Sequence, residues 1–435
     1  TCRFRGIWEA SHASARSPKP LKKRDRLDNF SSMNRAYSPP VGLIEDSLLN
    51  RQWDAWWITH PAESTREYGV FHFRKSFELE VAPDRFIVHI SADNRYKLFV
   101  NGEFVVHGPA RGDFQHWHFE TIDIAPHLKA GSNLLAVEVW NAGRHKPFAQ
   151  ISQMMALIVQ GNSAREAVVN SDGSWQVFRN PAHEPIIYKF NDPRLFHEYY
   201  VAGPLDHVDG RRYPWGWETL AFDASGWRAA EPLRKGIASG NCFEFGWQLA
   251  PRRVPLMERK RQQCRRIPRC EGVDAPPQPG ATVSIPARTH AKLLLDWGEL
   301  TTGFVRLTLT GGRGATVTLH SSEALYDRDK RKGHREQLEG MNGIHDTFIS
   351  DGGRSRTFET AWTRSLRWVE MEVQTESEAL EVNDIVVDAI AYPTRFTASF
   401  ESDDPELQQI WGACLRTQRL SAQETFVSDL YWEQM

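Results

Sequence analysis

Short runs of β-type residues, separated by turn residues, fill most of this chain from about residue 53 onward. Examples are 86–90, 96–100, 134–139 and 304–310. No long helical stretch separates these runs. Short strands with frequent turn signals and no intervening helices are typical of antiparallel sandwiches. The sequence therefore predicts a mainly β protein.

One turn can be placed closely. Asn101-Gly102 directly follows the β-type run 96–100, and residues 104–106 resume the β pattern. Asn-Gly tolerates the positive φ values of a tight two-residue turn. We therefore expect a β-hairpin here.

A second strand can be assigned a buried face. From Arg367 to Val373 apolar and charged residues alternate, so that Val369, Met371 and Val373 share one face while Glu370 and Glu372 take the other. Because successive side chains of a strand point to opposite sides, this alternation predicts a half-buried strand.

Length and composition bound the class of protein. A chain of 435 residues is too long for one ordinary core, so we expect at least two domains. It has 40% hydrophobic residues, 25% charged residues and a formal net charge of -2, which is ordinary for a soluble globular protein. No cationic surplus favours a nucleic-acid or membrane partner. No run approaches the roughly 18 apolar residues of a membrane span, so an integral membrane protein is not expected.

The period of the apolar residues changes near residue 404. Asp404 can cap a helix whose first turn begins with Pro405. The residues that then fall on one stripe are Leu407, Ile410, Trp411, Cys414 and Leu415. One helix cannot bury such a stripe alone, so the helix is expected to belong to a larger unit. We expect the stripe to promote aggregation and removal of residues 402–435 to improve solubility.

These observations predict a division of the chain into successive parts. The parts are an irregular or disordered leader at 1–48, a β-sandwich region at 49–250 that is either one unit or two (49–160 and 161–250), a linker at 251–279, a second β-sandwich domain at 280–399, and the start of a helical domain at 400–435.

Several segments, in order, resemble the bacterial α-L-rhamnosidase family. In the first sandwich they are FRKSF (73–77), SADNRY (91–96), VNGE (100–103) and GPARGD (108–113). Later ones are EALYD (323–327), KGHRE (332–336), EG (339–340), FESDD (400–404), ETFV (424–427) and YWEQ (431–434). Each alone is weak, but their common order across about 380 residues is specific.

The resemblance implies a fold and an activity. The family joins jelly-roll-like β-sandwich domains to an (α/α)6 catalytic barrel, of which this chain would hold only the first helix. It hydrolyses terminal α-L-rhamnosides with inversion, using one carboxylic acid and one carboxylate. Glu433 matches the proton-donating glutamate, and Trp432 beside it is expected in the substrate pocket. The second carboxylate would come from later in the barrel, so these 435 residues alone are expected to be inactive.

Two positions depart from the family pattern. Ser428 stands where the family has a sugar-binding Asp, with Asp429 next to it, and Leu430 replaces the usual Pro. A neutral hydroxyl holds a sugar diol less strongly than a carboxylate does. Ser428, Asp429 and Trp432 are the candidate substrate-binding residues. A related hydrolase acting on another sugar therefore remains an alternative, as does a carbohydrate-binding β-sandwich module.

Other residues are given structural interpretations. Asp93, Asn94, Arg111 and Asp113 could bind sugar or Ca²⁺, but Asp and Asn near turns more often satisfy backbone groups. Five cysteines without CxxC spacing favour free thiols, with Cys264 and Cys270 the one pair close enough to join. No histidine spacing suits zinc, and neither a metal nor a cofactor is expected.

Overall fold

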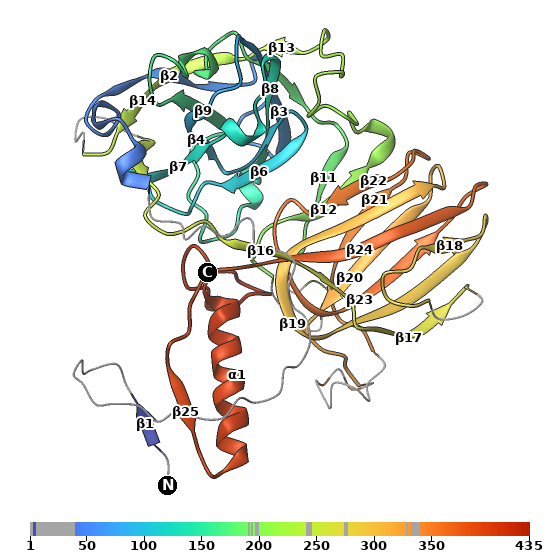
Figure 1. The fold of residues 1–435 in the computed structure, drawn as a ribbon. Helices are drawn as coiled ribbons and strands as arrows, with labels where there is room; N and C mark the ends of the chain where they lie inside the picture. The colour runs from blue at the N-terminus through green and yellow to red at the C-terminus, as the bar shows by residue number, and fades with distance from the viewer. Residues whose placement is uncertain are drawn as a thin grey trace.

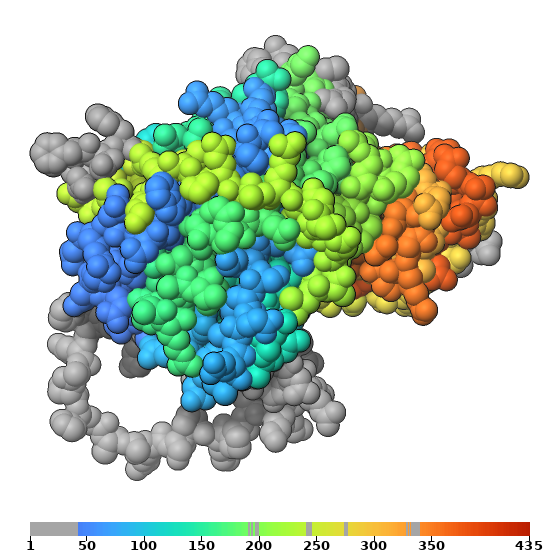
Figure 2. Space-filling view, turned by 90° about the horizontal axis from the view of Figure 1, so that it is seen from above, coloured from blue at the N-terminus to red at the C-terminus, as the bar shows by residue number. Residues whose placement is uncertain are grey.

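The computed structural model describes most of the chain beyond residue 39. The described residues are 3–5, 40–189, 192, 195, 200–240, 246–273, 277–327, 329, 331 and 340–435. Two β domains lie side by side, as the view from above shows (Figure 2). Among the described residues there is one α-helix, α1 (Pro405–Ser421), so the predicted mainly β fold is confirmed.

The first domain is a sandwich of two sheets. One is six-stranded, in the order β13 (Arg228–Ala229), β10 (Gln176–Arg179), β3 (Gly69–Leu79), β8 (Gly131–Asn141), β5 (Arg95–Val100), β6 (Glu103–Gly108). The other closes into a ring, in the order β14 (Glu231–Ala238), β15 (Gln248–Pro251), β7 (Trp117–Asp123), β4 (Ile87–Asp93), β9 (Ala156–Gly161), β2 (Gln52–Thr59). Their inner faces share one core, in which Phe73 and Val137 of the first sheet meet Val88 and Leu157 of the ring.

The predicted hairpin is present. β5 and β6 pair antiparallel, and Asn101 and Gly102 between them have φ values of 52° and 90°. Both angles lie in the left-handed region, which Asn and Gly enter most readily. The Asn101 amide also donates to the His127 carbonyl at 2.8 Å, which ties the turn to the sandwich.

The second domain is built around one large sheet (Figure 1). Its order is β11 (His183–Ile186), β12 (Leu205–Asp209), β21 (Ile344–Ile349), β20 (Thr316–Ser322), β23 (Arg364–Gln374), β19 (His290–Gly311), β24 (Leu380–Ala391), β16 (Glu258–Gln263). Three more strands pair with β19 or β24: β17 (Arg266–Glu271), β18 (Val283–Ile285) and β22 (Arg356–Glu359). The 22-residue β19 changes register between Asp296 and Thr301.

β23 carries the predicted alternation. Val369, Met371 and Val373 are at most 1% exposed, whereas Glu370 and Glu372 are half-buried. The apolar side chains enter the core of the second domain.

The chain crosses between the two domains more than once, which the predicted division does not include. The sequence predicts that residues 161–250 belong to the first sandwich region, either as part of one unit or as a second unit. Instead, β11 and β12 within this stretch join the sheet of the second domain. β12 pairs in parallel with β21, after which the chain returns to the first domain through β13, β14 and β15. Turn composition cannot reveal this crossing, because the partner strand lies about 140 residues downstream.

The expected linker at 251–279 also contains regular structure. β16 pairs with β24 along six residues, and β17 pairs with β19. Their sequences, ERKRQQ and RIPRCE, are mostly polar, and every residue of both strands is exposed or half-buried. Strands with so few apolar residues resemble a linker in sequence.

Short 3-10 turns complete the described structure, and two of them lie at the end of the predicted leader and just beyond it. The turns are η1 (Pro40–Leu43), η2 (Asp46–Leu49), η3 (Ala125–His127), η4 (Gly143–His145), η5 (Ala167–Val169) and η6 (Gly210–Arg212). Ile44 and Leu48 of the leader are buried in the first domain. The rest of the predicted leader between residues 6 and 39, and the 332–336 motif, lie outside the described residues.

The helix begins as predicted. The Asp404 carboxylate accepts the backbone N–H of Glu406 at 2.9 Å, and Pro405 occupies the first turn. α1 extends away from both β domains, with β25 (Ser399–Glu401) and β1 (Arg3–Arg5) paired beside it (Figure 1). No residue of α1 is buried. No helix among the described residues has the length and hydropathy needed to cross a membrane.

Candidate functional site

The residues after α1 form a segment between the two β domains. This C-terminal segment, residues 422–435, runs back from α1 to the junction of the domains, where the chain end lies (Figure 1). Its backbone is bonded to the second domain, where Tyr392 donates to the Ala422 carbonyl and Val201 to the Trp432 carbonyl, both at 2.9 Å. The first domain reaches it through the Arg111 side chain, which donates to the Gln434 carbonyl at 2.8 Å. The candidate residues from the sequence all lie in it.

A tight turn presents Glu433. One oxygen of the Asp429 carboxylate accepts the backbone N–H groups of Tyr431 at 2.9 Å and Glu433 at 3.3 Å, and also that of Trp432. The Gln434 N–H closes the turn on the Asp429 carbonyl at 2.7 Å. Asp429, a candidate for binding substrate, thus has one oxygen engaged in shaping the turn.

The other two candidates flank the half-buried Glu433. The Ser428 hydroxyl donates to the Glu433 carboxylate at 3.5 Å, a long hydrogen bond. Trp432 is 8% exposed and packs edge-on against Tyr431, with Tyr200 beyond it. The structure therefore brings Ser428, Asp429, Trp432 and Glu433 into one turn with an apolar flank.

Glu424 anchors the start of the segment, and sequence reasoning assigned it no role. Its side chain is 8% exposed and lies 2.9 Å from Arg95 and 3.6 Å from Arg252. Its carboxylate also accepts the backbone N–H of Arg111 at 3.2 Å. Burial would raise the pKa of Glu424, but Arg95 and then Arg252 hold it down to about 2. A glutamate within a polar run gave no sequence signal of burial.

Ion pairs continue from Glu424 across the junction of the domains. Lys97 of the first domain lies 2.9 Å from Glu359 of the second and 3.7 Å from Glu138 of its own domain. Arg259 bridges Glu359 and, at 3.1 Å, Asp388. Burial would raise the pKa of Glu359, yet Lys97 and then Arg259 lower it to about 2. The charges are paired, as buried charges must be.

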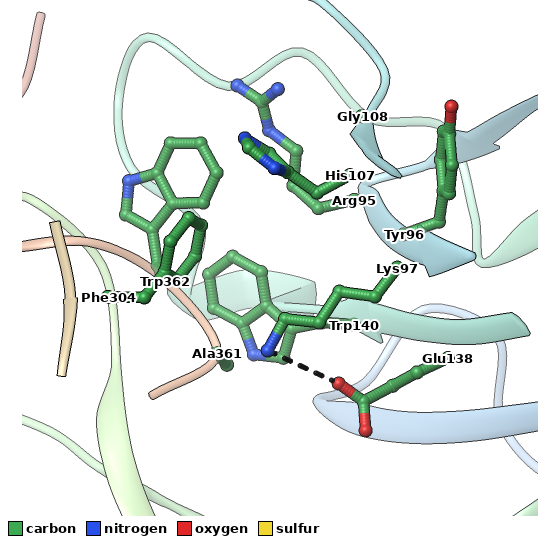
Figure 3. Close-up of a pocket in the computed structure, with 10 residues that line it drawn as sticks. All are labelled: Arg95, Tyr96, Lys97, His107, Gly108, Glu138, Trp140, Phe304, Ala361 and Trp362. Carbon is green, nitrogen blue, oxygen red and sulfur yellow. Dashed lines mark ion pairs between the residues drawn. The ribbon is translucent and has the colours of Figure 1, made fainter. Parts of the chain in front are cut away.

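The pocket at this junction is too small for a sugar. It is lined by Arg95, Tyr96, Lys97, His107, Gly108, Glu138, Trp140, Phe304, Ala361 and Trp362 (Figure 3). The space open to a water-sized sphere is about 10 Å³, enough for one water molecule. Burial, and then Arg259, lowers the pKa of His107 to about 3, so this imidazole is neutral. We interpret the pocket as packing behind the C-terminal segment.

A larger hollow lies elsewhere on the first domain. Its volume is about 530 Å³, and its lining comes from residues 42–46, 162, 163, 165 and 166 and from two positions near the start of β4. None of the lining residues belongs to the C-terminal segment.

The polar cluster near the hairpin has the structural role that the sequence favoured. Asp93 and Asn94 are fully buried. Asp93 accepts the N–H of Gln153 at 2.6 Å and the indole N–H of Trp247 at 3.0 Å, and Asn94 accepts the N–H of Ala142 at 2.9 Å. These groups satisfy buried donors and are closed to solvent.

The remaining two members lie on the following loop. Asp113 accepts the N–H groups of Gln115 and His116 as a turn residue. Arg111 instead reaches the C-terminal segment, donating to the Gln434 carbonyl at 2.8 Å.

The described cysteines and possible metal ligands add no site. Cys264, Cys270 and Cys414 are free thiols, so the considered pairing of Cys264 with Cys270 is absent. Cys2 and Cys242 lie outside the described residues. Among the described residues, no group of three or more His, Cys, Asp or Glu side chains could hold a metal ion.

Two family models match successive parts of the chain. Residues 82–239 match the family model of the α-L-rhamnosidase N-terminal domain, and residues 287–390 match that of the bacterial α-L-rhamnosidase concanavalin-like domain. The two matches follow one another in the order of the two β domains. The chain therefore belongs to the bacterial α-L-rhamnosidase family.

Individual proteins similar to this chain are rhamnosidases. A curated α-L-rhamnosidase from Streptomyces avermitilis is 25% identical over 228 residues, which cover 52% of this chain and 18% of that protein. The solved rhamnosidase of Bacillus sp. GL1 superimposes with a TM-score of 0.72 at 16% identity, covering 88% of this chain and 60% of that chain. The α-L-rhamnosidase from Dictyoglumus thermophilum gives 0.60 at 19% identity, covering 87% and 40%. The chain thus spans less than two thirds of each relative.

Proposed function

We propose that this chain is the N-terminal β portion of a hydrolase that cleaves terminal α-L-rhamnosides with inversion, and that Glu433 is its general acid. The observation that carries the proposal is the turn at 428–434. It presents a half-buried carboxylate beside an apolar flank, between two domains that both match α-L-rhamnosidase models.

The chemistry assigns one task to this chain. Glu433 donates a proton to the glycosidic oxygen as the C–O bond breaks, while a second carboxylate removes a proton from the attacking water. In an inverting enzyme the two groups stand about 6.5–9.5 Å apart, which leaves room for that water. By family resemblance the second carboxylate belongs to the helical barrel, so we propose that these 435 residues alone are inactive.

A hydrolysis assay tests this proposal in two forms of the protein. With an aryl α-L-rhamnoside, the 435-residue chain should release no phenol, and turnover by it would contradict the proposed inactivity. In a form that includes the barrel, Glu433→Gln should lower kcat by about 10²–10⁴-fold. Glu381→Gln, on an exposed position of β24, is the control. NMR of the first product should show the β-anomer; the α-anomer would exclude inversion.

One observation favours a related hydrolase that acts on another sugar. The residue beside Glu433 is Ser428, a neutral hydroxyl in place of the family's carboxylate. Neutral hydrogen bonds to a sugar diol are about half as strong as charge-assisted ones. A panel of aryl glycosides with the barrel-containing form distinguishes the two, because a preference of kcat/KM for a sugar other than α-L-rhamnose would support this second candidate.

A further inference from the structure

Gln434, the residue after Glu433, is buried and hydrogen-bonded at both ends of its side-chain amide. It is 5% exposed. The amide oxygen accepts the indole N–H of Trp362 at 2.8 Å, and the amide nitrogen donates to the carbonyls of Leu430 at 3.1 Å and Thr363 at 3.4 Å. An indole nitrogen only donates and a carbonyl only accepts, so these partners specify the orientation of the amide.

The backbone of Gln434 is equally constrained. Its carbonyl accepts from Arg111 of the first domain at 2.8 Å, whereas Trp362 and Thr363 belong to the second domain. Its φ is 53°, in the left-handed region that a residue with a Cβ rarely adopts. The contacts that hold it there come from both β domains, and the next residue back along the chain is Glu433.

We infer that Gln434 is a positioning residue for Glu433: by binding Trp362 on one domain and Arg111 on the other, it sets the direction in which the Glu433 carboxylate leaves the turn. The inference rests on the proposed function. It gives the β domains a part in catalysis, because they hold the acid in place. A displacement of a catalytic group by about 1 Å can cost roughly 10²-fold in rate.

Two substitutions test the amide. Gln434→Met keeps the length and removes both hydrogen-bonding ends. Gln434→Glu keeps an oxygen for Trp362, but only its protonated form can also donate to Leu430. The matched control is Gln160→Met, because Gln160 is 3% exposed and its amide accepts from Ala55 and donates to the Gly161 carbonyl within the first sandwich.

The first measurement needs no activity. Hydrogen exchange of peptides covering residues 429–434 in the 435-residue chain should quicken by at least about tenfold in Gln434→Met and stay unchanged in Gln160→Met. Unchanged exchange in Gln434→Met would overturn the inference and leave the proposed function intact.

The second measurement uses the barrel-containing form with an aryl α-L-rhamnoside. Gln434→Met should lower kcat by about 10–100-fold with KM within about twofold, since placement of the acid matters in the transition state. Relative to wild type, Gln434→Glu should regain rate as the pH falls and Gln434→Met should not. Wild-type kcat in Gln434→Met, or the same pH dependence in both variants, would overturn the inference alone. No turnover by the wild type would overturn the proposed function and, with it, the role of Gln434.

Discussion

Helix α1 and the C-terminal segment follow one another in the chain but differ in the regularity of their backbone and in their burial. α1 has 17 residues and none of them is buried. Even Ile410 and Leu407 of its apolar stripe are 51% and 36% exposed. The segment has irregular backbone, yet Tyr431 and Gln434 are at most 5% exposed. The more regular element is the less buried one.

The difference shows that regular structure and burial have separate causes. α1 forms from local signals, a cap and an apolar period. The segment is held by partners distant in sequence: Arg95 pairs with Glu424 across 329 positions, and the Tyr431 hydroxyl donates to the Ser321 carbonyl at 2.6 Å. Contacts of this kind order a segment without a repeating backbone pattern.

Removing the charge of Glu424 should have the largest effect on the order of the C-terminal segment relative to α1. Glu424→Gln leaves Arg95 buried without its anion, although Arg252 keeps Glu120 at 3.1 Å. Loss of a buried charge partner typically costs about 3–5 kcal/mol. We expect the segment to detach and its hydrogen exchange to approach that of an exposed peptide. Exchange in β3 and β8 should stay slow, and the exposed control Glu381→Gln should change neither region. Slow exchange of the segment in Glu424→Gln would show that the ion pairs do not hold it.

Acid should loosen the junction of the domains, and below pH 4.5 it should do so more steeply than in the sandwich cores. In the first sandwich, burial lowers the pKa of His89 to about 4, so its effect lies between pH 6.5 and 4. The pKa values of Glu138, Glu359 and Glu424 are about 2 when folded and 4.5 otherwise, so their stabilisation is present above pH 4.5 and lost as the pH falls toward 2. The pKa of His107 is about 3 instead of 6.5, so stability also falls from pH 6.5 toward 3 as the unfolded state takes up a proton. Each group contributes about 1.4 kcal/mol per pH unit within its window.

Calorimetry between pH 7 and 3.5 checks this pH dependence. Below pH 4.5 the transition that involves the junction should move to lower temperature faster than those of the sandwich cores. Replacing the central pair by Lys97→Met with Glu359→Gln should flatten the part of the profile below pH 4.5. A profile in which all transitions move together, or one that the double variant leaves unaltered, would contradict the assignment.

Charging the exposed stripe of α1 should improve solubility without disturbing the segment. The sequence predicts that removal of residues 402–435 improves solubility. The structure shows that this stretch contains an exposed helix and a buried segment, for which we expect opposite effects. Ile410→Lys, at a 51% exposed position, should raise the soluble fraction. Removing residues 422–435 should lower it, because Tyr200 and Trp362 would lose their cover. Centrifugation and light scattering compare the two, and equal solubility would contradict the distinction.

Loss of the helix cap should have the smallest effect and remain confined to α1. Asp404→Ala removes the acceptor for the Glu406 N–H and should cost the helix about 1 kcal/mol. Circular dichroism should show a small loss of helix, with no change in exchange of residues 429–434. Asp404→Asn, which retains an acceptor oxygen, is the control. A change in the segment would mean that α1 and the segment are coupled.

Sequence reasoning succeeded where structure follows from neighbouring residues. The Asn101-Gly102 turn, the alternating face of β23 and the capped start of α1 each depend on a pattern of a few positions. The same reasoning, with family resemblance, selected Ser428, Asp429, Trp432 and Glu433, which the structure places in one turn; their roles stay predictions.

The tertiary structure alone decided which distant residues meet. The crossing of β11 and β12 into the second domain, the strands β16 and β17 in a polar stretch, and the burial of Glu424 and Gln434 all depend on partners far along the chain. A polar side chain looks the same in sequence whether it faces water or a buried partner, because its burial becomes favourable only when folding supplies the matching charge or hydrogen bond.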